Sequence, residues 1–168
     1  MESVDDAGPK VSLEYSTDGN TWSPFEVGST TVTLANIEDK MYMRATSAGN
    51  TGMGCYSSDY GGLIYNKFVM TGKISASGNV DTLLNQNGNA TLTFACYYGL
   101  FEYCTSLTSA PELPATTLAD HCYELMFSGC TSLTTAPTIK TYTSNLTGCF
   151  SQMLNMWDSY KHKWGQLK

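Results

Sequence analysis

Basic and histidine side chains are scarce in this sequence. Its 168 residues include nine Lys and Arg against 15 Asp and Glu, for a net charge of −6, and only two are histidines. A groove that follows nucleic-acid phosphates needs clustered cations, so we expect no nucleic-acid partner. Two histidines also leave little for a catalytic triad or a histidine-rich metal centre. We therefore expect a protein that is not an enzyme and that needs no cofactor and no metal.

Long apolar runs are also missing. No window approaches the roughly 18 consecutive apolar residues that suggest a transmembrane helix, so we expect no membrane span. Residues 1–9 are polar and acidic and predict a solvated leader, whereas a secretory signal starts basic and continues apolar. No glycine-rich phosphate loop is present either.

The first half of the chain has the pattern of short strands separated by turn residues. Val11, Leu13 and Tyr15 alternate with polar neighbours, and residues 18–20 supply turn chemistry before Trp22 resumes the pattern. Apolar residues make up 42% of the whole chain, enough for a packed core. The pattern predicts a β-sandwich-like module over residues 10–77.

Further strands are expected at 32–34, 41–45 and 68–74, with a long tyrosine-bearing loop at 52–62. Residues 78–95 are a polar join with apolar residues at helical spacing, which predicts a short helical cap.

A repeat occupies the second half. The segment 96–113 recurs as 122–139, 26 residues later, with identical residues at ten of 18 positions. A third copy begins at Cys149 and then degenerates. A period of this length is typical of one coil of a solenoid. The predicted repeats are 96–121, 122–148 and a degenerate 149–160 (together 96–160), followed by a basic tail at 161–168.

Residues at equivalent repeat positions are expected to form inward ladders, because each coil buries its apolar face only against its neighbours. The predicted ladders are Cys96, Cys122 and Cys149; Cys104 and Cys130; Phe101 and Phe127; and Leu107 and Leu133. Pro111 and Pro137 are expected to end the short strand of each coil. The predicted fold is mainly β with short helices, a small antiparallel β-sandwich capping a short leucine-rich-repeat-like solenoid.

The string Cys-Thr-Ser-Leu-Thr-Ser/Thr-Ala-Pro starts at Cys104 and again at Cys130, where Met-Phe-Ser-Gly precedes it. It resembles the BspA-like leucine-rich repeat proteins of gut and oral Bacteroides-type bacteria over residues 96–160. The sequence at 13–22 and 68–74 is similar to the β-rich module that precedes such repeats. The resemblance implies an extracellular or cell-surface recognition protein that binds a host or neighbouring-cell macromolecule through its repeat face.

Candidate contact residues are those that differ between the two good repeats, since framework positions repeat and contact positions vary. Four of the differing pairs are the candidates, namely Tyr98 and Glu124, Glu102 and Ser128, Tyr103 and Gly129, and Glu112 and Thr138. Tyr98 and Tyr103 are the expected anchors, because tyrosine offers a large contact area at low entropic cost. The alternative is that these are solvent-facing substitutions without a partner.

The six cysteines leave three alternatives open, namely buried free thiols, disulfides and metal ligation. Five lie at repeated positions, where a small buried hydrophobe is the simplest role, and their spacing does not match a zinc site. Asp120-His121-Cys122 suggests a catalytic cluster, but consecutive residues seldom converge on one reacting atom. We expect a structural role for it.

The predicted function is thus a non-catalytic surface recognition or adhesion module that binds a protein or glycan. Two other functions stay open. One is a structural fibre or decoration protein of a phage of gut bacteria, which a stable trimer would favour. The other is a surface spacer, for which changes at the variable face would not affect binding.

Overall fold

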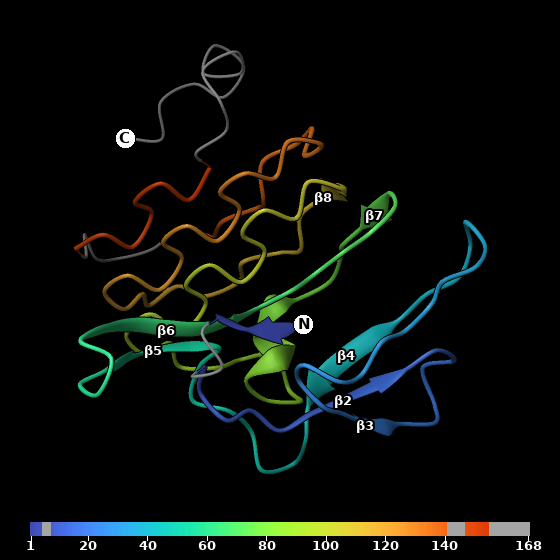
Figure 1. Ribbon diagram of the computed structural model, residues 1–168, viewed down its shortest axis with the longest axis horizontal. Coiled ribbons are helices and arrows are strands. Elements are labelled where there is room, and N and C mark those ends of the chain that lie inside the picture. The colour runs from blue at the N-terminus through green and yellow to red at the C-terminus, as the bar shows by residue number, and fades with distance from the viewer. Residues whose placement is uncertain (5–7, 141–146, 155–168) are drawn as a thin grey trace.

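The computed structural model describes residues 1–4, 8–140 and 147–154 (Figure 1). Within these ranges the chain is mainly β, as predicted, with small sheets and little helix. None of the helices described there is long and apolar enough to cross a membrane. The predicted basic tail, 161–168, and the degenerate repeat beyond residue 154 lie outside the described residues.

One antiparallel sheet has strand β2 (Leu13–Ser16) at its centre, between β3 (Ser23–Phe25) and β4 (Tyr42–Ala45). Leu13 lies opposite both Phe25 and Ala45, and all three are buried. The Asp18 carboxylate accepts the backbone N–H of Thr21 at 2.7 Å and closes the turn between β2 and β3. The predicted hairpin is confirmed.

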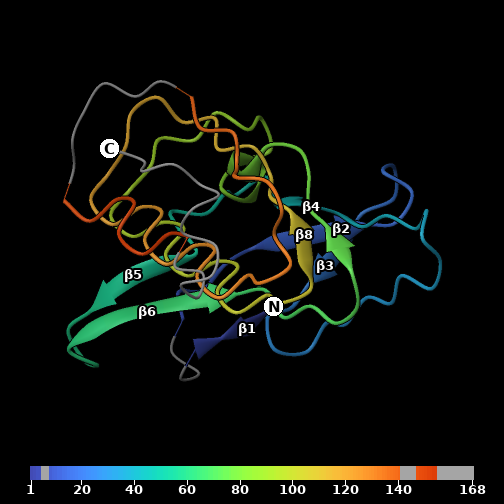
Figure 2. The same cartoon turned by 90° about the horizontal axis from the view of Figure 1, so that it is seen from above.

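A second antiparallel sheet contains β1 (Glu2–Ser3), β6 (Gly62–Lys67) and β5 (Gly54–Ser57), in that order. Strands β5 and β6 form a hairpin whose connecting turn lies at the edge of the molecule (Figures 1 and 2). Part of the expected loop at 52–62 is therefore strand, because residues 54–57 pair with 62–65.

Two other strand predictions are wrong. Val32 and Leu34 alternate with polar neighbours, but residues 31–35 form no strand. The expected strand 68–74 is reduced to β7 (Ile74–Ser75), because Phe68 donates its N–H to Leu100 of the repeat region and does not continue the sheet.

The repeat region contains three stretches that lie side by side, which we call turn rows 1 (93–104), 2 (119–130) and 3 (147–154) (Figure 2). Along each row, alternate backbone N–H groups donate to the carbonyl three residues earlier, as in successive β-turns. In rows 1 and 2, N–H groups between these donate to the following row. Tyr97 bonds to Cys122 at 3.0 Å and Phe101 to Met126 at 2.9 Å, while Tyr123 bonds to Cys149 at 3.1 Å.

Every fourth residue of a row has a positive φ. In row 1 these are Ala95 (53°), Gly99 (60°) and Tyr103 (57°). The same backbone recurs in rows 2 and 3, at His121, Leu125 and Gly129 and then at Gly148 and Gln152. Left-handed φ at the third residue of a turn is typical of type II. Turns with a left-handed third residue alternate with turns that lack one. Side chains along a row therefore point inward in pairs and outward in pairs.

The inward pairs stack between rows. The ring centres of Tyr97 and Tyr123 are 5.7 Å apart and the ring planes are inclined by 3°. For Phe101 and Phe127 the distance is 5.4 Å and the angle is 5°. The other predicted ladder residues are buried, namely Cys96, Cys104, Leu107, Cys122, Cys130, Leu133 and Cys149. These residues belong to one continuous core that also includes Leu13 and Phe25 of the first sheet.

A layer without any repeat signature precedes row 1. Phe68 stacks on Phe101 at 5.0 Å, and β7 pairs in parallel with β8 (Leu107–Ser109). Further on, Asn79 bridges to Glu112. Residues 68–80 therefore run alongside 101–113 much as one repeat runs alongside the next.

Pro111 follows β8, which ends at Ser109. The corresponding strand before Pro137 is not formed. There the Thr134 N–H and hydroxyl donate long hydrogen bonds, of 3.5 and 3.4 Å, to the Thr108 carbonyl.

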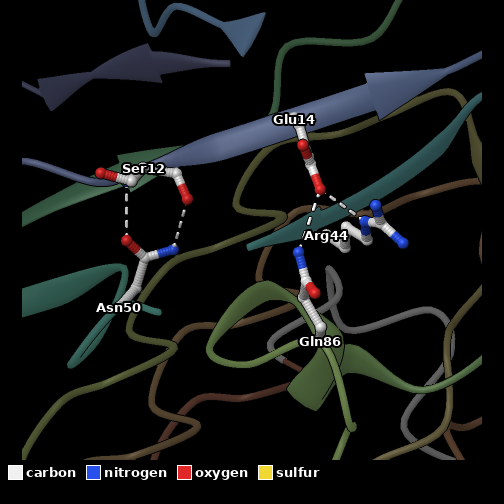
Figure 3. A network of polar contacts seen from close by, with 5 residues as sticks. All are labelled: Ser12, Glu14, Arg44, Asn50 and Gln86. Carbon is white, nitrogen blue, oxygen red and sulfur yellow. Dashed lines mark hydrogen bonds and ion pairs between the residues drawn. The ribbon is translucent and has the colours of Figure 1, made fainter. Parts of the chain in front are cut away.

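The predicted helical join at 78–95 contains a single turn of 3₁₀ helix, η2 (Val80–Leu83), with Asn79 as its N-cap. Two side chains connect this segment to the first sheet (Figure 3). Asn50 bonds to both backbone groups of Ser12 and, at 2.8 Å, to the Leu83 carbonyl. Glu14 accepts from Arg44 at 2.6 Å and from Gln86 at 3.1 Å.

Candidate functional site

The outward pairs of the turn rows form a surface that we call the outer face. Because two inward residues alternate with two outward ones, its members follow from the backbone pattern. They are Tyr98, Gly99, Glu102 and Tyr103 in row 1, and Glu124, Leu125, Ser128 and Gly129 in row 2. Tyr103 is 65% exposed, whereas the inward Tyr97 is fully buried.

Strand β6 adds two side chains to this face. Residues 65 and 67 lie on the same side of a strand, since side chains alternate with period two. The Tyr65 hydroxyl donates to Glu102 Oε2 at 2.5 Å, and the Tyr65 ring meets that of Tyr98 edge-on at 5.0 Å. Lys67 Nζ lies 5.7 Å from the centre of the Tyr103 ring. The result is a cluster of Tyr65, Tyr98 and Tyr103 around Glu102, with Glu124 in the next row, which we call the tyrosine cluster.

Two glycines make room for these aromatic rings. A Cβ atom at Gly129 would lie 2.5 Å from Tyr103 Cδ1, and a Cβ atom at Gly99 would overlap the ring of Tyr65. The rings of Tyr65 and Tyr103 therefore lie directly against glycine backbone, where a Cβ atom would not fit. Tyr65 is held additionally by its hydrogen bond to Glu102, which is buried.

Within the cluster, the surroundings of Tyr65 and Tyr98 favour the protonated form of their hydroxyl groups. Burial, followed by the hydrogen bond to Glu102, raises the pKa of Tyr65. Burial also raises the pKa of Tyr98, with smaller contributions from the carboxylates of Glu124 and Glu102. Neutral hydroxyls beside carboxylates present both donors and acceptors, which suits a polar partner.

His121 and Cys122 have separate partners in the structure. His121 Nδ1 contacts Glu124 Oε2, and its ring lies 5.3 Å from that of Phe94. The Cys122 thiol is hydrogen-bonded to Cys149, and this bond together with burial raises the pKa of Cys122. A thiol with a raised pKa is a poor nucleophile.

Of the candidate contact residues, the structure brings Tyr98, Glu102, Tyr103 and Glu124 together on the outer face. Glu102 is buried as the partner of Tyr65 and is therefore a support for the cluster. Glu112 and Thr138 are exposed but lie on another edge, beside residues 78–80 and 113. The sequence comparison of the two repeats missed Tyr65 and Lys67, which belong to no repeat.

No group of three His, Cys, Asp or Glu side chains within the described part of the chain is arranged to hold a metal ion.

Comparisons with protein-family models, with curated proteins and with solved structures found no match for this chain.

Proposed function

We propose that this chain is a non-catalytic recognition module of the BspA-like type. In this proposal the turn rows are coils of a short solenoid, and the β-rich first half is a sandwich-like cap on one end. The module acts outside the cell or at its surface, where it binds a protein or glycan on another cell through the outer face. The tyrosine cluster is the observation that carries the proposal.

The composition of the cluster suits recognition. Tyrosine combines a large apolar ring with a hydroxyl that forms hydrogen bonds, and it loses little entropy when it is bound. Tyr103 is 65% exposed and sits above Gly129. Tyr98, beside it in row 1, is half-buried against Tyr65. A partner would thus meet one projecting ring and one supported ring.

The cluster is also preorganised. The short hydrogen bond between Tyr65 and Glu102 and the glycine backbone under the rings restrict the side chains before a partner arrives. Preorganised side chains avoid part of the entropic cost of binding. The hairpin of β5 and β6 extends the surface, because Tyr56 (60% exposed) and Tyr60 (63%) lie on it.

The test is binding of the purified chain to arrayed glycans and to immobilised extracellular matrix proteins. We expect a hit whose affinity falls at least about tenfold in Tyr103→Ala, as for an aromatic residue at the centre of an interface. Thr138→Ala is the control, since Thr138 is exposed on a different edge, and it should bind like the unmodified chain.

Equal binding by the two variants would overturn the proposal and favour a spacer. A stable trimer in light scattering after size exclusion, with no binding at the outer face, would favour a phage fibre instead.

A further inference from the structure

The hydroxyl groups of Tyr97 and Tyr123 differ in their hydrogen bonding. Both side chains are fully buried in the core. The Tyr97 hydroxyl donates to Asp81 Oδ1 at 2.8 Å, and Asp81 is itself buried. The Tyr123 hydroxyl, by contrast, is buried without a hydrogen-bond partner among the described residues. A buried hydroxyl left in this way costs free energy, so folded proteins almost always pair such groups.

The rings on either side of Tyr123 explain why its hydroxyl is unpaired. On one side the ring stacks on that of Phe150, with ring centres 5.9 Å apart, and a phenyl ring has no oxygen to accept a hydrogen bond. On the other side it stacks on the ring of Tyr97. Burial is the largest cause that raises the pKa of both tyrosines, so each hydroxyl keeps its proton. The Tyr123 hydroxyl is therefore a donor that lies beside a second tyrosine.

The spacing of these two rings sets the distance between the hydroxyl oxygens. The ring centres are 5.7 Å apart and the ring planes are inclined by 3°. Because Tyr97 and Tyr123 occupy equivalent positions of neighbouring turn rows, both rings extend from the backbone in the same direction. The two oxygens are then about as far apart as the ring centres. This separation is too long for one hydrogen bond and matches two O–H···O bonds of about 2.8 Å placed end to end.

We propose that the core holds a binding site for a single water molecule between the hydroxyl groups of Tyr97 and Tyr123. The water accepts the Tyr123 proton and donates to the Tyr97 oxygen, whose own proton goes to Asp81. Hydrogen bonds then run from turn row 2 through turn row 1 to η2. Buried waters in proteins typically bond to polar groups that have no other partner. The site does not depend on what the outer face binds.

Thermal unfolding of the full chain distinguishes a bound water from an unpaired hydroxyl. Tyr123→Phe keeps the ring and removes the donor. With a bound water, this variant loses hydrogen bonds, and its melting temperature should fall by about 2–5 °C. If the hydroxyl is unpaired, its removal should raise the melting temperature or leave it unchanged, which would overturn the proposal. Tyr60→Phe is the control, since Tyr60 is 63% exposed, and it should melt like the unmodified chain.

A double variant tests whether the two hydroxyls share the water. Tyr97→Phe removes the acceptor, so adding Tyr123→Phe to it should lower the melting temperature by less than Tyr123→Phe does alone. Additive losses would contradict a shared water. A high-resolution crystal structure of the unmodified chain decides the matter if a variant fails to fold. It should show a water oxygen within about 2.5–3.0 Å of both hydroxyl oxygens. A side chain or an empty space in that place, or a direct bond between the two tyrosines, would overturn the proposal.

Discussion

Glycines in the turn rows are required for space more than for backbone freedom. The positive φ that recurs every fourth residue is adopted by Tyr103, Leu125 and other non-glycine residues as well as by glycine. Glycine occurs where an aromatic ring of the preceding layer lies directly on the backbone, as Tyr65 does on Gly99. A substitution there adds an overlap to the ordinary cost of a left-handed residue.

This distinction predicts the effect of two matched substitutions. Gly99→Ala should lower the free energy of unfolding by about 2–4 kcal/mol, from backbone strain and from displacement of Tyr65. Gly72→Ala is the control. It has a similar φ of +76° but nothing within 4 Å of the new Cβ, and should cost about 1 kcal/mol. Urea denaturation of both variants measures the difference, and equal losses would contradict the account of the ring packing.

At the scale of the elements, the rows are held together by continuous aromatic stacks. Phe68, Phe101 and Phe127 form one such stack across three layers, and Phe127 is fully buried. Each row has few contacts of its own, so its position depends on the layers on either side.

Phe127→Ala should therefore cost about 3–5 kcal/mol, because it leaves a cavity between rows and interrupts the stack. Phe94→Ala removes the same atoms from row 1 at a position that is 43% exposed, and should cost under about 1 kcal/mol. Thermal or urea unfolding that gave similar values for both would show that the stack contributes little to stability.

The 3₁₀ helix η2 supplies a buried carboxyl, Asp81, to the second ring stack, that of Tyr97 and Tyr123, which predicts a pH dependence. The Tyr97 hydroxyl donates to Asp81 Oδ1 at 2.8 Å, and burial raises the pKa of Asp81. A raised pKa in the folded state means that this group stabilises the fold at low pH. The contribution is lost as the pH rises through the folded pKa.

Asp81→Asn keeps an acceptor for Tyr97 and removes the titration. As the pH rises from about 4 to about 7, the free energy of unfolding of this variant should fall less than that of the unmodified chain. Urea melts at several pH values measure the two curves, and parallel curves would show that Asp81 is not the responsible group.

For the whole molecule, the question is how the first sheet and the turn rows become one cooperative unit. Asn50 bonds to Ser12 beside β2 and to the Leu83 carbonyl at the end of η2 (Figure 3). Its own N–H donates to Leu84 at 2.8 Å. Glu14 adds a second link through Gln86.

Asn50→Ala should destabilise the chain by about 1–3 kcal/mol, because it leaves backbone groups on both sides without a partner. Asn36→Ala is the control. Asn36 bonds only within an exposed loop, to Asp39, and its loss should cost less than about 0.5 kcal/mol. A loss in Asn50→Ala no larger than in the control would show that this link is unimportant for cooperativity.

The side-by-side arrangement of 96–113 and 122–139 can be predicted from the repeat alone. Identical residues at a fixed period occupy equivalent places, and stacking them buries like against like, as Phe101 and Phe127 do. The sequence also determined the hairpin between β2 and β3, since its turn residues lie next to strands of clear alternation.

No sequence pattern predicts that residues 68–80 extend the stack or that Tyr65 and Lys67 complete the outer face, because both depend on packing between distant segments. Backbone hydrogen bonds and ring stacking require apolar residues at the right spacing but no particular motif. Phe68 and Ile74 therefore join the stack although residues 68–80 lack the repeat motif. Val32 and Leu34 show the reverse case. Their alternation suits a strand, but a strand also needs a neighbour to bond to, and that depends on where the rest of the chain lies.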